Sequence, residues 1–421
     1  MTLNIQTDRR LVREAGKSTR FALLSFTAPD ATRAASRPPL NVAFVVDRSG
    51  SMGGSKIALA REAVIQALRM LRDSDWFSIV AYDHEIDVLV PSTQASPEAL
   101  RNASSRVNEL QARGNTDLSG GWLKGCEQIA EHPGAGRTTR CLLLSDGLAN
   151  AGIVDREELA GHSRALGERG ITTSCLGIGN DYDERLLEAI ATSSGGHSYD
   201  VETAVQIPDI LTSELGEALE IVARDVVVTI RPGTGMAVTT LNKYPLAENA
   251  DGSLALQLGD LSARQDVSLV FRIEFPAGSD TATLAAAFRV SDAAGALTAP
   301  ETDIVWTFAG QDANDAQPRN RTVDHAVAQL YAAAAKAEAL EMNRNGRYDQ
   351  SGKWLERTAR KIEAYAGDDA FLRRLVAELR EQNMAEYSAP MSAASMKRQY
   401  AANLNMSRMR DESGKARRRP N

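Results

Sequence analysis

The chain has 421 residues, which is enough for two or three domains. Its composition, 43% hydrophobic and 24% charged, is that of a globular protein, and the formal net charge of −7 argues against binding to nucleic acids. The chain contains no run of about 18 apolar residues that would span a membrane. The polar N-terminal segment lacks the apolar core of a secretory signal, and the cysteines lack metal-binding spacing, so we expect a cytoplasmic protein with reduced thiols.

Two short strand-like runs, TLNIQTD and STRFALLSFTAP, lie in residues 1–37. A similar pattern of short runs returns in residues 223–310, for example in DVVVTIRPG, DVSLVFRIEF and TDIVWTFAG. Short runs separated by Gly, Asp and Pro predict an antiparallel β-sandwich. We therefore expect the N-terminal strands to belong to this sandwich, with residues 38–222 inserted between its strands.

Residues 38–222 alternate between apolar runs and amphipathic stretches. The runs LNVAFVVD, WFSIVAYD, RCLLLSDG and ITTSCLGIG are typical of strands that are covered on both faces. After the first run, Ile57, Ala60, Val64 and Leu68 recur at helical spacing. Strands that alternate with helices imply right-handed crossovers and a mostly parallel sheet. The predicted fold is a doubly wound, open α/β domain.

The segment that follows the sandwich has a helical pattern. Residues 320–385 contain three amphipathic stretches, in VDHAVAQLYAAAAKAEALE, QSGKWLERTARKIEAY and DAFLRRLVAELREQ, and these predict three helices. Residues 386–421 are basic and lack a clear period, so we expect a basic, flexible tail there.

Oxygen-bearing side chains follow the first apolar run of the α/β segment at alternate positions. LNVAFVVD ends at Asp47, and Ser49 and Ser51 come next, in DRSGS. Thr116 lies in the glycine-preceded stretch GNTD, and Asp146 ends another apolar run, in LLLSDG. In an open α/β sheet, ligands bind outside the carboxyl ends of the strands. We therefore expect these five side chains to meet at one edge of the sheet.

The five side chains offer three hydroxyls and two carboxylates, without a thiol or an imidazole. Hard oxygen donors of this kind suit Mg²⁺, or else Mn²⁺ or Ca²⁺, and not Zn²⁺. The two carboxylates formally neutralise a divalent ion, and the hydroxyls add ligands without adding charge. The sequence thus predicts a metal site that has room for a further carboxylate from a partner. The predicted site residues are Asp47, Ser49, Ser51, Thr116 and Asp146.

The motifs DRSGS, GNTD and LLLSDG, in this order, resemble the metal-ion-dependent adhesion site of the von Willebrand factor A domain family. The resemblance covers residues 40–219, and the flanking segments are similar to those of uncharacterised bacterial proteins with this domain. It implies that Ser49 and Ser51 bind the metal through their hydroxyls and that Thr116 binds it directly in the ligand-occupied state. It also implies that Asp47 and Asp146 act largely through bound water or exchange with Thr116.

The function that this resemblance implies is that of a non-enzymatic scaffold, whose cation coordinates an acidic residue of a partner protein. One alternative is an accessory subunit of an AAA+ ATPase or chelatase-like complex. In that complex the partner would hydrolyse ATP, because this chain itself has no ATPase motif. A second alternative is a Mg²⁺-dependent phosphohydrolase, since aspartyl phosphatases also place an Asp at the end of the first strand. Those enzymes need a second Asp two residues later, where this chain has Ser49.

Asp83 and Asp87 are interpreted as solvated turn residues.

Overall fold

The computed structural model describes residues 2–30, 38–132, 136–411 and 413–418, without the side chains of residues 382–384. Parts of the expected N-terminal segment and of the expected tail lie outside these residues. Within the described residues, no helix combines the length and the apolar character that crossing a membrane requires.

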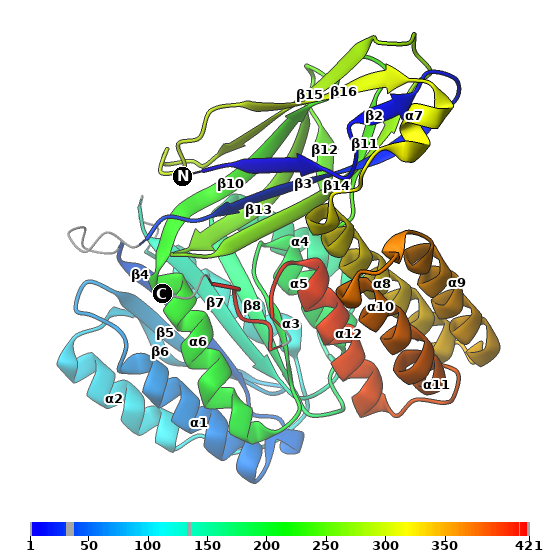
Figure 1. Ribbon diagram of the computed structural model, residues 1–421. Helices are drawn as coiled ribbons and strands as arrows, with labels where there is room; N and C mark the ends of the chain where they lie inside the picture. Colours follow the sequence, from blue (N-terminus) through cyan, green and yellow to red (C-terminus); the bar gives the residue numbers. More distant parts are fainter. Residues whose placement is uncertain (1, 31–37, 133–135, 412, 419–421) are drawn as a thin grey trace. The chain divides into compact units, whose positions relative to one another are not determined.

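The chain divides into two compact units (Figure 1). Residues 32–220 form the first, which we call the α/β unit. Residues 1–31 and 221–421 together form the second, which we call the sandwich unit. Along the chain, the α/β unit therefore follows one segment of the sandwich unit and precedes the other.

The α/β unit contains a six-stranded sheet with the strand order β6-β5-β4-β7-β8-β9. Neighbouring strands are parallel except β5 and β6, which are antiparallel. The strands are β4 (Leu40–Asp47), β5 (Trp76–Tyr82), β6 (Ile86–Gln94), β7 (Thr138–Ser145), β8 (Ile171–Ile178) and β9 (Ser198–Val201). This arrangement confirms the predicted doubly wound, mostly parallel sheet. The short turn after β5 cannot support a crossover, so β6 becomes an antiparallel edge strand.

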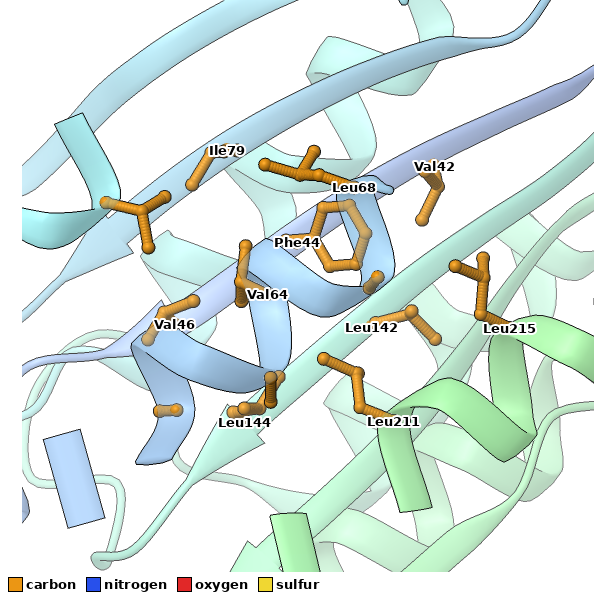
Figure 2. Packing of buried hydrophobic residues seen from close by; sticks show 14 of the residues in the cluster. Val42, Phe44, Val46, Val64, Leu68, Ile79, Leu142, Leu144, Leu211 and Leu215 are labelled. Carbon is orange, nitrogen blue, oxygen red and sulfur yellow. The ribbon is translucent and has the colours of Figure 1, made fainter. Parts of the chain in front are cut away.

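Helices cover both faces of this sheet, because alternate residues of its strands point to opposite sides. Val42 and Phe44 of β4 lie in a core with α1, α2 and α6, whereas Ala43 and Val45 lie in a core with α3, α4 and α5. Figure 2 shows side chains of β4, β7, α1 and α6 that meet in the first of these cores. The helices are α1 (Ser55–Leu68), α2 (Pro97–Asn108), α3 (Leu118–Ala130), α4 (Arg156–Glu168), α5 (Glu184–Ser193) and α6 (Ile207–Leu219). The second core also contains three buried, free cysteines, namely Cys126, Cys141 and Cys175.

The sandwich unit contains two sheets, with the strand orders β1-β3-β14-β11 and β12-β13-β10-β15-β16-β2. Their pairs are antiparallel except β2 with β16, and β3 pairs with β14 from Ser18↔Phe275 to Thr27↔Asp266. The strands are β1 (Asn4–Thr7), β2 (Leu11–Arg13), β3 (Ser18–Thr27), β10 (Ile221–Arg231), β11 (Ala237–Thr240), β12 (Leu246–Glu248), β13 (Leu254–Ser262), β14 (Asp266–Phe275), β15 (Thr283–Ser291) and β16 (Thr302–Ala309). The N-terminal strands β1 to β3 thus complete sheets whose other strands follow the α/β unit in sequence.

Helices follow the last strand of the sandwich. They are α7 (Gln311–Ala316), α8 (Arg321–Arg344), α9 (Tyr348–Ala366), α10 (Ala370–Glu378), α11 (Met384–Tyr387) and α12 (Ala393–Ser407). The helix α8 packs Val323, Val327 and Leu330 against Leu23 of β3 and Val270 of β14. The helical segment therefore covers the outer face of the β3–β14 sheet, and a C-terminal helical segment is confirmed.

The structure differs from the expected flexible tail in residues 386–421, because most of this segment is packed. Met396, Tyr400 and Leu404 lie four residues apart on α12; the first two pack against the core of the other helices, and Leu404 is buried. Beyond α12, Met409 reaches the core of the sandwich. The segment is rich in Lys and Arg, and its apolar stripe with helical period is narrow, so the sequence pattern there is weak.

Candidate metal centre

Four of the five predicted site residues follow two neighbouring parallel strands. Asp47 is the last residue of β4; Ser49 comes next, and Ser51 lies in a short 3₁₀ helix, Gly50–Met52. Asp146 directly follows β7. Since β4 and β7 are paired and parallel, their carboxyl ends meet at the same edge of the sheet.

The serine hydroxyls converge on one oxygen of Asp146. The hydroxyl of Ser51 donates a hydrogen bond to Oδ1 of Asp146 at 2.7 Å, and the hydroxyl of Ser49 lies 3.5 Å from the same atom. The two hydroxyl oxygens are 3.1 Å apart. Asp47 is tied to this group because its Oδ1 accepts the backbone amide of Ser49 at 2.8 Å. Oxygen atoms of all four residues therefore lie in one small volume.

Thr116 reaches the same region from the loop that precedes α3. Thr116 is only 4% exposed. A Cβ atom built at Gly147 would lie 3.5 Å from Oγ1 of Thr116 and 3.8 Å from Oγ of Ser51. The Thr116 hydroxyl thus faces the backbone beside Asp146, although no hydrogen bond joins it to the other four side chains within the described residues.

Backbone hydrogen bonds fix the Thr116 loop to the strand ends. The amide of Gly50 donates to the carbonyl of Gly114 at 3.0 Å, and the amide of Arg113 donates to the carbonyl of Arg48 at 2.6 Å. Gly114 has φ = +71°, a conformation that favours glycine. The sequence GNT therefore places the Thr116 hydroxyl at the sheet edge through local backbone geometry.

Asp47 is a buried carboxylate in an environment that disfavours its charge. Burial raises the pKa of Asp47 to about 6, and the charge of Asp146 acts in the same direction. The amide and hydroxyl of Ser49 and the hydroxyl of Ser145 oppose this rise through hydrogen bonds. No cation pairs with Asp47 within the described residues, so a positive ion at this edge would favour its ionised form.

Lys56, near the start of α1, is a site residue that the sequence did not reveal. Its Nζ lies 2.5 Å from Oδ2 of Asp146, and its side chain is 25% exposed. The ammonium therefore occupies the side of the Asp146 carboxylate opposite the serines. A lysine at the second position of a helix is common, so the one available signal was its closeness in sequence to DRSGS.

Asp83 forms the centre of a charge network beside the site, and its interpretation as a solvated turn residue was wrong. The carboxylate is fully buried and accepts hydrogen bonds from Nε of Arg48 at 3.1 Å and from Nε of Arg113 at 2.8 Å. Burial acts to raise the pKa of Asp83, but the Glu85 amide and the two guanidiniums outweigh it, and the pKa is lowered. Asp87 is half exposed and accepts Nη2 of Arg48 at 2.5 Å. The network holds Arg48 away from the cluster around Asp146.

A second group of possible metal ligands lies elsewhere in the α/β unit, where His197, Glu214 and Glu217 bring ligand atoms within 4.8 Å of one another. The buried carboxylate of Glu214 accepts hydrogen bonds from the hydroxyls of Ser174 and Tyr199. Glu214 is thus already satisfied by protein donors, and the group gives no reason to expect a metal.

Comparisons with known proteins agree with this fold. Residues 41–213 match the model of the von Willebrand factor type A domain. The uncharacterized protein YfbK of Escherichia coli K12 is 29% identical over 243 residues, which cover 56% of this chain and 42% of that protein. Human inter-alpha-trypsin inhibitor heavy chain H4 is 31% identical over 181 residues, which cover 41% of this chain and 20% of that protein. The chain thus spans less than half the length of these relatives.

Two solved structures are similar over most of the chain. A von Willebrand factor type A protein from Catenulispora acidiphila has a TM-score of 0.67 at 20% identity, covering 89% of this chain and 88% of that one. The ArnB paralog VWA2 from Sulfolobus acidocaldarius has a TM-score of 0.59 at 15% identity, covering 96% and 98%. At these identities the likeness establishes the fold alone. Taken with the family match, it shows that residues 41–213 have the fold of a von Willebrand factor type A domain.

Proposed function

We propose that this chain is a non-enzymatic scaffold that binds an acidic residue of a partner protein through a divalent cation. The residues that hold the cation in this proposal are Asp47, Ser49, Ser51, Thr116 and Asp146. Mg²⁺ suits this all-oxygen donor set, and Mn²⁺ or Ca²⁺ are alternatives. The cation supplies an electrophilic contact for a carboxylate oxygen of the partner, and the surrounding loops supply specificity.

The proposal rests on the two buried carboxylates at the sheet edge. Asp47 and Asp146 are both fully buried, and among the described residues Lys56 alone pairs with either of them. One lysine leaves one negative charge without compensation, and a buried charge needs a partner. A divalent cation would offset this charge and leave one positive charge for an acidic residue of a partner, and the hydroxyls of Ser49 and Ser51 offer neutral ligands at the same place.

The residue two positions after Asp47 argues against phosphohydrolase chemistry. The position that would carry the acid–base Asp is Ser49, whose hydroxyl transfers protons poorly at neutral pH.

The loop that follows Asp146 offers a surface beside the proposed contact. The amide of Asn150 donates to the carbonyl of Thr116 at 3.1 Å, and the amide of Ile153 donates to the hydroxyl of Ser119 at 2.8 Å. These bonds tie the loop to the start of α3. Leu148 on this loop is 54% exposed. An apolar side chain of the partner, next to its acidic residue, would be buried against Leu148.

Two measurements on the full chain test the proposal. Electron paramagnetic resonance of Mn²⁺ measures cation binding directly, and we expect Ser49→Ala and Asp146→Asn to weaken it strongly. Ser104→Ala is the matched control, because the one side-chain hydrogen bond of Ser104 among the described residues stays within α2, to the carbonyl of Leu100. Unchanged Mn²⁺ binding in both site variants would contradict the metal site.

Selection of displayed peptides on the chain in Mg²⁺ tests the acidic contact. We expect selected peptides to share an Asp or Glu and to lose binding in EDTA, or when that residue becomes Asn or Gln. Peptides that bind equally well with the amide, or in EDTA, would refute the cation-mediated contact even if the cation binds. Mg²⁺-dependent hydrolysis of p-nitrophenyl phosphate that Asp47→Asn abolishes would refute the non-enzymatic role.

A further inference from the structure

A cationic cavity lies within the sandwich unit, between the N-terminal strands β2 and β3 and the helix α7. Its volume is about 200 Å³. Four cationic side chains and one carboxylate line it, together with an amide, namely Arg9, Arg13, Lys17, Arg20, Asp315 and Asn314. The excess of positive charge around a small hollow suggests an anion as its occupant.

Arg20 is the most informative of these residues because it is only 5% exposed. Its Nε, Nη1 and Nη2 donate hydrogen bonds to the carbonyl of Leu11, the carbonyl of Thr19 and Oδ1 of Asn314, each at 2.7 Å. All three acceptors are neutral. No carboxylate forms an ion pair with Arg20 within the described residues. Burial and the charge of Arg9 together lower the pKa of Arg20 to about 10, although the charge of Asp8 opposes this.

The charges around the cavity leave two cations without carboxylates. Arg9 pairs with Asp8 at 3.2 Å, and Arg13 pairs with Asp315 at 2.9 Å. Lys17, like Arg20, has no ion pair among the described residues. Arg20 is buried, and the nearest carboxylate that acts on it, that of Asp8, already pairs with Arg9, so a bound dianion would stabilise this arrangement.

We propose that this cavity binds a phosphate-type oxyanion. Arginine guanidiniums and a lysine ammonium are the groups that proteins use for this purpose, because they donate several charge-assisted hydrogen bonds to oxygen. The cavity is smaller than the ~300–1,000 Å³ of pockets that enclose drug-sized molecules. It therefore fits inorganic phosphate, or the phosphate group of a phosphorylated residue, and not a whole nucleotide.

A purely structural role for Arg20 is the competing explanation. Its bond to Asn314 ties β3 to α7, and Nδ2 of Asn314 in turn donates to the carbonyls of Val12 and Ala309. This role explains the hydrogen bonds of Arg20. It does not explain why Lys17 and Arg13 line the same hollow, and it predicts no response to phosphate.

Isothermal titration calorimetry of the full chain with inorganic phosphate, at constant ionic strength set by KCl, tests the proposal. We expect saturable binding that chloride does not reproduce. Phosphoserine and serine form the second arm: phosphoserine is expected to bind and serine is not, and the tighter of phosphate and phosphoserine identifies the source of the anion. Absence of saturable heat with both anions would overturn the proposal.

Variants of exposed residues keep the test independent of folding. Lys17→Gln and Arg13→Gln are expected to weaken phosphate binding about tenfold, the loss that one charge-assisted hydrogen bond implies. Asp315→Asn removes the carboxylate that competes for Arg13 and is expected to tighten binding severalfold. Arg231→Gln is the control, since Arg231 pairs with Glu301 at the surface elsewhere in this unit. Equal affinities in all four variants would show that the cavity is not the site.

Discussion

Replacing Lys56 with methionine is expected to tighten Mg²⁺ binding and to weaken the metal-free fold at the same time. Of the residues that the structure describes, Lys56 supplies the one ammonium that reaches Asp146, at 2.5 Å from Oδ2. A cation that uses the same carboxylate must either displace this ammonium or accept it as a positive neighbour. Methionine keeps the length and the apolar stem of lysine and removes its charge.

The structure sets the size of both effects. Asp146 is fully buried, and breaking a fully buried ion pair costs about 3–5 kcal/mol. The Lys56 side chain is 25% exposed, so we discount this to about 2 kcal/mol for the metal-free chain. For a domain of this size that corresponds to a fall in Tm of about 4–8 °C. In Lys56→Met the ammonium no longer competes with Mg²⁺ for the carboxylate of Asp146. The loss of this competition predicts Mg²⁺ binding about ten- to thirtyfold tighter.

Thermal unfolding in EDTA and in saturating Mg²⁺, together with calorimetric titration of Mg²⁺, measures both effects. The control is Lys124→Met, which removes the same charge from a surface pair with Glu127 on α3. We expect the gap between the two melting temperatures to widen in Lys56→Met and to stay unchanged in the control. If Lys56→Met lowers the EDTA melting temperature but binds Mg²⁺ no more tightly than the wild type, Lys56 positions Asp146 for the metal, and the competition argument is wrong.

Three further substitutions test particular contacts. Gly147→Ala should leave the stability almost unchanged, because its Cβ would make only ordinary contacts, but should weaken Mn²⁺ binding measured by paramagnetic resonance, because the methyl group would lie 3.5 Å from the Thr116 hydroxyl. Gly125→Ala should destabilise the α/β unit by about 1–3 kcal/mol in urea unfolding, since its Cβ would lie 2.3 Å from Cγ2 of Val45. Asp83→Asn should lower stability at neutral pH. Because the folded pKa of Asp83 lies below its usual 3.8, this loss should persist above that value and vanish as pH falls through the folded pKa, which unfolding measured against pH will reveal.

The fold of the α/β unit was predictable because its buried strands appear in the sequence as continuous apolar runs. LNVAFVVD is apolar from Val42 to Val46 because Val42 and Val45 face different helical layers, so this part of the strand shows no alternation. The packed C-terminal segment was not predicted because α12 buries a narrow stripe, Met396, Tyr400 and Leu404, among many polar residues. In such a helix, order comes from tertiary contacts rather than from a strong local signal.

The candidate site likewise contains residues that the local sequence predicts and residues that only tertiary packing brings to the site. Asp47 ends β4, Ser49 lies two residues beyond it, and Asp146 directly follows β7, so chain order and parallel pairing were enough to expect them at one edge. Lys56 and Asp83 act through partners that are brought near only when α1 and the β5–β6 turn pack against that edge, and no spacing rule encodes such contacts. Yet these partners determine the net charge of the edge, because Asp83 engages Arg48 while Lys56 meets Asp146. In the proposed site, the affinity for a cation would therefore depend on residues outside the motif, and motifs of the same five residues on other chains should differ in affinity according to the residue at the position of Lys56.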